Sequence, residues 1–207
     1  MRELIASSDD FMDPRVTELH CIMPIGNVPS VLEHGILSHV RAARLRHHSV
    51  ALQPVQDNRD VKSVPQGLKL HQYANLYFHA RNPMMYRRKE EAPNLCVLRV
   101  STAVLEQAGA VVTDCNAAST YVRFLAPSQW KCLDIEDIYA RVWTHPESEA
   151  REFQHKSRKC AEVLVPERVE PRFLVGAYVV DTEAADRLRG LEVDLPIEIN
   201  PVLCFRE

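Results

Sequence analysis

The order of strand-like and helix-like segments constrains the fold of this chain most strongly. Runs typical of strands occur at 17–23, 75–80, 94–101, 110–113, 161–165, 173–180 and 197–205. Runs typical of helices occur at 27–35, 102–109, 133–143, 147–157 and 182–190. Because the two kinds mix without the regular alternation of a parallel sheet, the pattern predicts the α+β class.

Turn and cap residues set the expected boundaries of these segments. Asn27 is the expected N-cap of the first helix, and Gly35 is its expected stop. Thr102 and Asp181 are the expected caps of two later helices. The stretch 37–70 has little periodicity, so we expect a long loop with short helical pieces, and loops of that length tend to be functional.

Length and apolar patterning set the broad class. A chain of 207 residues is long enough for one substantial core, so we expect a single domain over 1–207. The sequence has no uncharged apolar run of about 18 residues, and its first residues include acids where a signal peptide needs an apolar stretch. The expected location is therefore cytoplasmic, without a membrane.

The cysteines and histidines do not form a metal-binding pattern. The six cysteines include no C-x-x-C pair, which favours reduced, buried thiols over a zinc site or a disulfide framework. The adjacent His47 and His48 have no carboxylate or thiol at ligand spacing. We therefore expect no bound metal.

Charge is distributed unevenly along the chain. Residues 34–89 hold ten lysines and arginines against Asp57 and Asp60, a surplus of eight positive charges. The rest of the chain must then carry −11 to give the formal net charge of −3. This asymmetry is typical of a face that binds phosphates on an acidic body. The alternative is a solvated surface whose charges mix in space with acids from elsewhere.

Four polar residues interrupt or flank apolar runs: His20, Arg59, Tyr77 and Glu162. Taken singly, each has an ordinary interpretation: a structural histidine, a surface arginine, a core tyrosine and an exposed edge glutamate. Glu162 is the most informative, because a carboxylate that opens an apolar run loses hydration unless something offsets the loss. It is therefore either an exposed residue of an edge strand or a side chain with a role in the function of the protein.

Together these residues and their surroundings resemble the DarT family, the DNA-directed ADP-ribosyltransferase toxins of DarT/DarG toxin–antitoxin pairs. The matching pieces are LHCIMPIGNVPSVLEHGILS (19–38), SVALQPVQDNRDVKSVPQG (49–67), LHQYANLYFHARNPMMY (70–86) and CAEVLVPERVEPRFLVGAYV (160–179). They occur in the family's order and cover most of 17–180. The resemblance implies an ADP-ribosyltransferase-like fold with a split, mixed or antiparallel β core flanked by helices.

The resemblance also implies roles for two catalytic residues. Glu162 matches the family's catalytic glutamate, which positions the nicotinamide ribose of NAD and stabilises the oxocarbenium-like transition state. Arg59 matches the family's essential arginine. Because arginine is a poor base in water, we interpret Arg59 as a cation that stabilises the NAD phosphates or a base anion. We expect Glu162→Ala to cost little stability and nearly all turnover.

Three further residues match donor-binding positions of the family. His20 matches a histidine that hydrogen-bonds the NAD ribose or amide, and Tyr77 matches a tyrosine that stacks on nicotinamide. Asn27 is expected to aim its side chain and nearby backbone N–H groups at the donor. Where relatives often have His-x-Thr, this chain has His20-Cys21-Ile22.

The basic segments are the expected nucleic-acid contacts. One set is expected over the NAD pyrophosphate: Arg41, Arg44, Arg46, His47 and His48. Another set is expected along DNA: Arg81, Arg87, Arg88, Lys89, Lys156 and Lys159. The stretch 147–160 corresponds to the loop that presents the substrate in this family.

The expected acceptor is a base in single-stranded DNA. The pairing edge of a base cannot react inside a duplex, so the strand must be single or the base flipped. The resemblance favours thymine. The alternatives are guanine in DNA, or RNA, protein or a small molecule as acceptor. The family further implies NAD as donor and a macrodomain antitoxin, similar to DarG, as partner.

Overall fold

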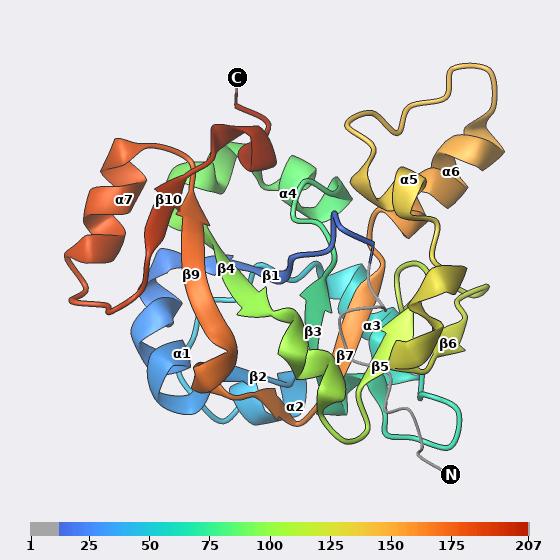
Figure 1. Ribbon diagram of the computed structural model, residues 1–207, viewed down its shortest axis with the longest axis horizontal. Helices are drawn as coiled ribbons and strands as arrows, with labels where there is room; N and C mark the ends of the chain where they lie inside the picture. Colours follow the sequence, from blue (N-terminus) through green and yellow to red (C-terminus); the bar gives the residue numbers. More distant parts are fainter. Residues whose placement is uncertain (1–12, 207) are drawn as a thin grey trace, which may run out of the picture.

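The computed structural model describes residues 13–206. Within them, eight strands form one sheet in the order β10-β9-β4-β1-β3-β7-β5-β6 (Figure 1). Its strands are β1 (Glu18–Pro24), β3 (Tyr73–Tyr77), β4 (Leu95–Ser101), β5 (Val111–Thr113), β6 (Phe124–Leu125), β7 (Glu162–Pro166), β9 (Leu174–Val179) and β10 (Ile197–Ile199). Neighbouring strands are antiparallel except β9 and β10, which are parallel. The mixed sheet confirms the predicted α+β class.

Short helices surround this sheet. They are α1 (Val28–His34), α2 (His39–Ala42), α3 (Gln53–Asp60), α4 (Pro83–Arg87), α5 (Ile135–Tyr139), α6 (Glu149–Arg158) and α7 (Thr182–Arg189). The 3-10 helices are η2 (Ile25–Asn27), η3 (Leu70–Gln72), η4 (Lys89–Asn94), η5 (Thr102–Glu106), η6 (Pro127–Cys132), η7 (Pro171–Phe173) and η8 (Pro201–Cys204). A second, small sheet joins β2 (Ile36–Leu37) to β8 (Arg168–Val169). Figure 1 shows α7 at the β9–β10 edge and α5 and α6 at the opposite end of the molecule.

The large sheet divides at the contact between β1 and β3. These two strands are paired only at His20 and Tyr77, whereas β1 pairs with β4 along its full length. Figure 1 shows β1 and β3 running in clearly different directions. The expected split of the β core therefore lies between β1 and β3, which touch at this one pair and diverge beyond it.

A hydrophobic core ties the two halves of the sheet together. It includes Leu19 of β1, Leu76 of β3, Leu98 of β4 and Val163 of β7, all fully buried. Burying apolar area stabilises the fold by about 25 cal/mol per Å². Because these strands share one core, β3 and β7 are held in place relative to β1. The polar residues His20 and Tyr77 pair at the contact between β1 and β3.

Several expected boundaries are correct. Asp181 caps α7, because its side chain accepts a hydrogen bond of 2.8 Å from the Ala184 backbone N–H. Gly35 follows α1 with a φ of 85°, where a Cβ atom would lie 2.1 Å from the Val169 carbonyl oxygen. The stretch 37–70 is a loop that holds α2, α3 and the start of η3.

Other boundaries were wrong. The segment after β4 is a 3-10 helix, capped by Ser101 and not by Thr102. The helix expected at 133–143 ends at Tyr139. The Ile138 and Ala140 carbonyls accept hydrogen bonds from the Lys159 ammonium at 2.7 and 2.8 Å. These tertiary bonds satisfy backbone groups at the helix end, which local sequence patterns do not reveal.

The acidic N-terminal stretch, taken as evidence against a signal peptide, lies mostly outside the described residues. Among residues 13–206, no helix is both long and apolar enough to cross a membrane. All six cysteines are free thiols, and Cys132 is the exposed one.

Candidate active site

A cavity of about 750 Å³ lies where β1 and β3 diverge. From the strands, its lining includes Cys21, Met23, Tyr73, Asn75, Tyr77 and Glu162. The segment before α3 and α3 itself form another part of the wall, which includes Arg59. The volume is within the usual range of small-molecule sites, about 300–1,000 Å³. The cavity therefore borders the β1–β3 contact of the sheet.

Arg59 and Glu162 meet at the wall of this cavity. Arg59 Nη1 donates hydrogen bonds to Glu162 Oε1 and Oε2, each 3.1 Å long. Both side chains are buried, with 5% of Arg59 and 1% of Glu162 exposed. Arg59 Nη2 is also buried and has no hydrogen-bond partner among the described residues. The two predicted catalytic residues therefore lie together, and the Nη2 group of Arg59 is unused among the described residues.

Three further contacts hold Glu162 and the loop beside it, and the sequence did not indicate them. The Ala117 backbone N–H donates to Glu162 Oε1 at 3.0 Å. The Glu162 N–H donates to Thr113 Oγ1 at 3.1 Å, and the Lys62 ammonium donates to the Ala118 carbonyl at 2.6 Å. The loop after β5 is thereby held against Glu162. Residues far apart in sequence form these contacts, and no spacing pattern indicates them.

Tyr77 lies opposite Glu162 in the β3–β7 register and lines the cavity. Burial raises the pKa of its phenol well above the ordinary value, and the neighbouring Glu162 carboxylate raises that pKa further. The hydroxyl is therefore neutral across the physiological range. A neutral ring beside the carboxylate is suited to packing against a flat ligand.

Asn27 holds the rim of the cavity. Its Nδ2 donates to the His48 carbonyl at 2.7 Å, and the His48 N–H donates to its Oδ1 at 3.1 Å. Asn27 occupies the N-cap position of α1, but its side chain makes no capping bond. The side chain instead fixes the segment around His47 and His48, and both histidines line the cavity.

His20 does not line this cavity. Its Nε2 lies 3.1 Å from Glu18 Oε1, and its ring neighbours are His79 and Tyr178. The strand segment that does line the cavity begins at the next residue, Cys21. Cys21, Ile22, Met23 and Pro24 all line it, so the cavity wall stops one residue short of His20.

Lys159 was wrongly expected to contact DNA. The side chain is fully buried, and its ammonium donates to two backbone carbonyls at the end of α5. Burial lowers the pKa of Lys159 to about 8. This lysine holds the segment after α5 against the start of β7 and cannot reach a phosphate outside the protein.

The other predicted DNA contacts occupy different surroundings. Arg87 of α4 is exposed and lines the cavity. Arg88 donates to the Val50 carbonyl at 2.9 Å and to Glu91. Lys89 lies over the Tyr86 ring. Pro83 and Met84 also line the cavity, so α4 borders it.

Three more basic residues lie elsewhere. Arg81 is half-buried and stacks on Phe205 at 4.1 Å. Lys156 is exposed on α6 and pairs with Glu152 one turn away. Arg41 approaches Glu167 at 3.8 Å.

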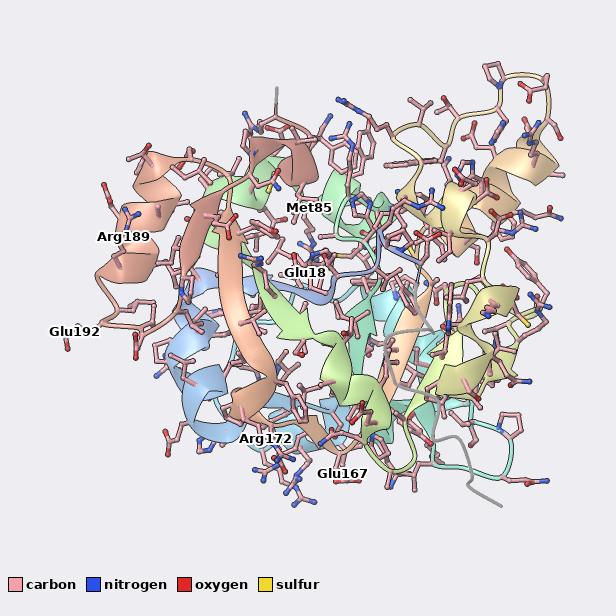
Figure 2. The ribbon with its side chains drawn as sticks, viewed as in Figure 1. Glu18, Met85, Glu167, Arg172, Arg189 and Glu192 are labelled. Carbon is pink, nitrogen blue, oxygen red and sulfur yellow. The ribbon has the colours of Figure 1, made fainter. Side chains whose placement is uncertain are left out.

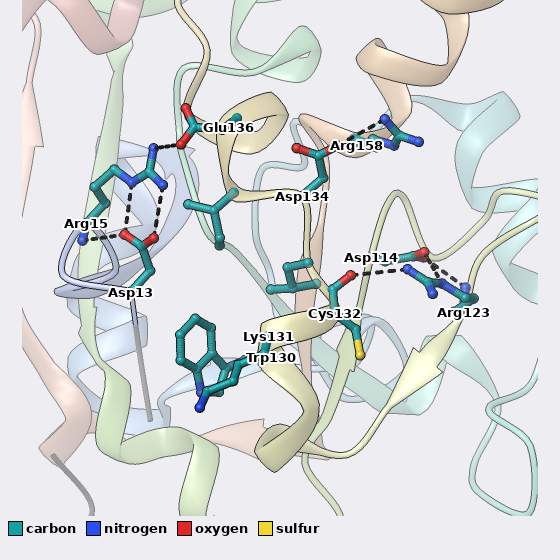
Figure 3. A pocket seen from close by; sticks show the side chains of 12 residues that line it. Asp13, Arg15, Asp114, Arg123, Trp130, Lys131, Cys132, Asp134, Glu136 and Arg158 are labelled. Carbon is teal, nitrogen blue, oxygen red and sulfur yellow. Dashed lines mark hydrogen bonds and ion pairs between the residues drawn. The ribbon is translucent and has the colours of Figure 1, made fainter. Parts of the chain in front are cut away.

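A second hollow of about 620 Å³ lies between η6, α5 and the end of α6 (Figure 3). Four ion pairs line it, formed by Arg15 with Asp13 and with Glu136, by Arg123 with Asp114, and by Arg158 with Asp134. No sequence-predicted site residue is among its lining residues. The cavity at the β1–β3 contact is therefore the candidate active site.

Comparison with known proteins gives related sequences. The chain is 33% identical over 208 residues to a DNA ADP-ribosyl transferase–DNA ADP-ribosyl glycohydrolase fusion protein of Thermosipho africanus, covering 94% of this chain and 51% of that protein. It spans about half the length of that fusion protein. It is also 27% identical over 207 residues to a DNA ADP-ribosyl transferase of a Thermus species, covering 94% of this chain and 96% of that protein.

Solved structures give the same fold, and a family model covers the chain. The Thermosipho africanus DarTG complex with ADP-ribose matches with a TM-score of 0.78 at 30% identity, over 91% of this chain and 51% of that one. The Thermus sp. 2.9 DarT complex with ADP-ribosylated ssDNA matches with a TM-score of 0.77 at 24% identity, over 92% and 97%. The model of the ssDNA thymidine ADP-ribosyltransferase family matches residues 20–205, so this chain belongs to the DarT family.

Proposed function

We propose that this chain transfers ADP-ribose from NAD to thymine in single-stranded DNA and releases nicotinamide. The observation that carries the proposal is the buried Arg59–Glu162 pair at the wall of the cavity between β1 and β3. In support, NAD⁺ is bound to the Thermus sp. 2.9 DarT in one matching structure. The cavity volume of about 750 Å³ fits a ligand of that class.

Glu162 is the proposed catalytic carboxylate. As the bond between the nicotinamide nitrogen and the ribose anomeric carbon breaks, its electron pair leaves with neutral nicotinamide. Positive charge then develops on the sugar, and a fixed carboxylate stabilises that charge. The Glu162 side chain is held by Arg59 and by the Ala117 N–H, so little reorganisation is needed during the reaction.

Arg59 is the proposed cationic partner. Its Nη1 is occupied by Glu162, while its buried Nη2 is unpaired among residues 13–206. An unpaired buried donor is costly, and a ligand oxygen at this position would remove that cost. Arginine is a poor general base in proteins. We therefore assign Arg59 to stabilising anionic oxygen, while the proton from the attacking base passes to water.

The donor is proposed to lie between Tyr77 and the segment held by Asn27. The neutral Tyr77 ring would pack against nicotinamide, and the segment at His48 would cover the rest of the donor. The Asn27–His48 bonds hold that segment in one conformation. For the His20 ring we propose a structural role with Glu18, because it makes its contacts there and not at the cavity wall.

The acceptor is proposed to approach along α4. Arg87 is exposed at the cavity, and Arg88 and Lys89 follow it at the start of η4. Cations in this order can contact successive phosphates of a strand. Lys156 on α6 is a second proposed contact. Single-stranded DNA is the proposed form because the pairing edge of the base must be free.

The experiment is a transfer assay with NAD and mixed single-stranded oligonucleotides, followed by the mass of each oligonucleotide. We expect one ADP-ribose added to thymine-containing strands and no addition by the Glu162→Gln variant. Addition to guanine strands, RNA or protein would replace the proposed acceptor. If NAD is consumed but no acceptor is labelled, the proposed donor site is supported and the proposed acceptor is wrong.

We further propose that residues 1–207 act as one transferase domain that is opposed by a macrodomain antitoxin similar to DarG. In support, one hydrophobic core cluster includes residues from Val16 to Cys204, and the Thermosipho relative is named as a fusion with a glycohydrolase. A purified macrodomain hydrolase should remove the label from modified DNA, and failure to do so would contradict this partnership.

A further inference from the structure

Three aromatic rings from separate segments meet beside α4. Tyr86 belongs to α4, Trp143 follows α5, and Phe205 follows η8. The ring centroids lie 5.1 Å apart for Tyr86 and Phe205, 5.5 Å for Trp143 and Phe205, and 5.9 Å for Tyr86 and Trp143. All three contacts are edge to face, with interplanar angles of 78°, 89° and 88°. The other two rings therefore fix the orientation of Tyr86.

Exposure differs sharply within this cluster. Trp143 is 7% exposed, whereas Tyr86 is 47% exposed. A large aromatic ring that is half exposed and already held rigidly loses little further conformational freedom when it binds a planar group. Tyr86 is therefore the member of the cluster that a ligand can reach.

Cations surround the same rings. The Arg81 guanidinium lies 4.1 Å from the Phe205 ring centroid, and the Lys89 ammonium lies 4.6 Å from that of Tyr86. The segment 81–91 holds four basic residues against Glu90 and Glu91. Aromatic rings set among positive charges are the combination that binds single-stranded nucleic acid, through stacking of bases and neutralisation of phosphates.

The cluster is continuous with the active site. Arg87, the residue after Tyr86, lines the cavity with Met84 of the same helix. Tyr86 itself is not among the lining residues, so its ring lies on α4 just beyond the cavity. A strand whose target base enters the cavity beside Glu162 and continues past Arg87 would bring a neighbouring nucleotide to the Tyr86 ring.

We propose that Tyr86, held by Trp143 and Phe205, is a stacking subsite for a base that flanks the target base. Arg87 and Lys89 then contact the adjoining phosphates, and Lys89 leaves the Tyr86 ring as the base arrives. This subsite rests on the proposed function, since it extends the acceptor path to a second nucleotide. It adds affinity and selects strands long enough to reach it.

The first test measures binding without catalysis, by fluorescence anisotropy of a labelled single-stranded oligonucleotide in the Glu162→Gln background. Adding Tyr86→Leu should weaken binding about tenfold, as expected for loss of one stacked base, and Tyr86→Phe should restore it. Phe173→Leu is the matched control, because the Phe173 ring also lies beside a cation, with Arg172 at 4.9 Å, and belongs to η7, which Figure 2 shows far from α4. Unchanged binding by Tyr86→Leu, or equal weakening by Phe173→Leu, overturns the subsite.

The second test separates stacking from a structural role by acceptor length. With NAD present, Tyr86→Leu should raise KM about tenfold for a long oligonucleotide and leave the rate on a dinucleotide too short to reach Tyr86 unchanged. An equal loss on both acceptors overturns the proposal, because it would indicate damage to the fold. If the wild type binds DNA but does not modify it, the transferase function fails, while the anisotropy comparison still decides the subsite.

Discussion

Arg59 and Glu162 are 103 positions apart in the sequence, yet one guanidinium nitrogen bonds both oxygens of the carboxylate at 3.1 Å. The pair is almost completely buried, so each charge depends on the other for its stabilisation. The proposed catalytic role and the folding of this region therefore involve the same contact, and substitutions here must be measured for both activity and stability.

Glu162→Gln should remove most of the transfer activity while leaving the fold close to native. Glutamine has the size of glutamate and its side-chain oxygen can still accept from the Ala117 N–H, but it supplies no negative charge to the developing oxocarbenium ion. Loss of one such electrostatic contact costs about 10²–10³ in rate, measured by mass spectrometry of the oligonucleotide. Glu192→Gln, an exposed surface change, is the control. Comparable rates in the two variants would contradict the assignment.

The buried pair also changes an expectation about stability. The sequence led us to expect that Glu162→Ala would cost little, but a 1% exposed carboxylate leaves Arg59 charged and unpaired when it is removed. Breaking such a pair typically costs about 3–5 kcal/mol. Arg59→Met breaks the same pair and leaves the Glu162 carboxylate buried and unpaired, so we expect that loss of unfolding free energy in urea denaturation. The double variant Arg59→Met and Glu162→Leu should recover part of it. A double variant no more stable than Arg59→Met would show that the charges are not coupled.

The sequence was sufficient for the fold class, and three of the predicted site residues lie at one cavity. Arg59, Tyr77 and Glu162 were identified from family-like segments, and the structure places all three at one cavity. The strand runs that became β4, β7 and β9 were found because buried strands are continuous apolar runs.

The remaining differences between expectation and structure have physical causes outside local sequence. Lys159 belongs to a basic run, so its burial depends on carbonyls at the end of α5, about twenty positions earlier. His20 and Cys21 are neighbours, and only the assembled sheet decides which of them borders the cavity. The Ala117 contact with Glu162 uses a backbone N–H, which every residue except proline carries.

Asn27→Ala should weaken donor binding selectively. The change removes both hydrogen bonds to His48, each worth about 0.5–1.5 kcal/mol, and frees the segment at the cavity rim. We expect KM for NAD to rise about tenfold with KM for the oligonucleotide unchanged. Asn94→Ala, which removes an exposed contact with Arg187, is the control. A rise in both Michaelis constants would argue against a donor-side role.

Arg87→Gln should weaken acceptor binding in a salt-dependent way. If Arg87 neutralises one phosphate, the slope of log K against log salt should fall by about 0.7 for a single strand. Arg172→Gln is the control, because Arg172 is exposed and lies far from α4, which is marked by Met85 in Figure 2. Identical slopes for Arg87→Gln and the wild type would exclude a phosphate contact at this position.

Lys159→Met should remove a pH dependence of stability. Burial lowers the pKa of Lys159 from 10.5 to about 8, so between these values the unfolded chain keeps a proton that the folded chain has lost. Stability therefore rises with pH across this window, and the contribution of the lysine is smallest below pH 8, where both states are charged. We expect the free energy of unfolding of the wild type, relative to Lys159→Met, to increase from below pH 8 to pH 10.5, measured by urea titration. If the difference in unfolding free energy between the two proteins stayed constant across this pH range, Lys159 would be as readily protonated in the folded chain as in the unfolded chain.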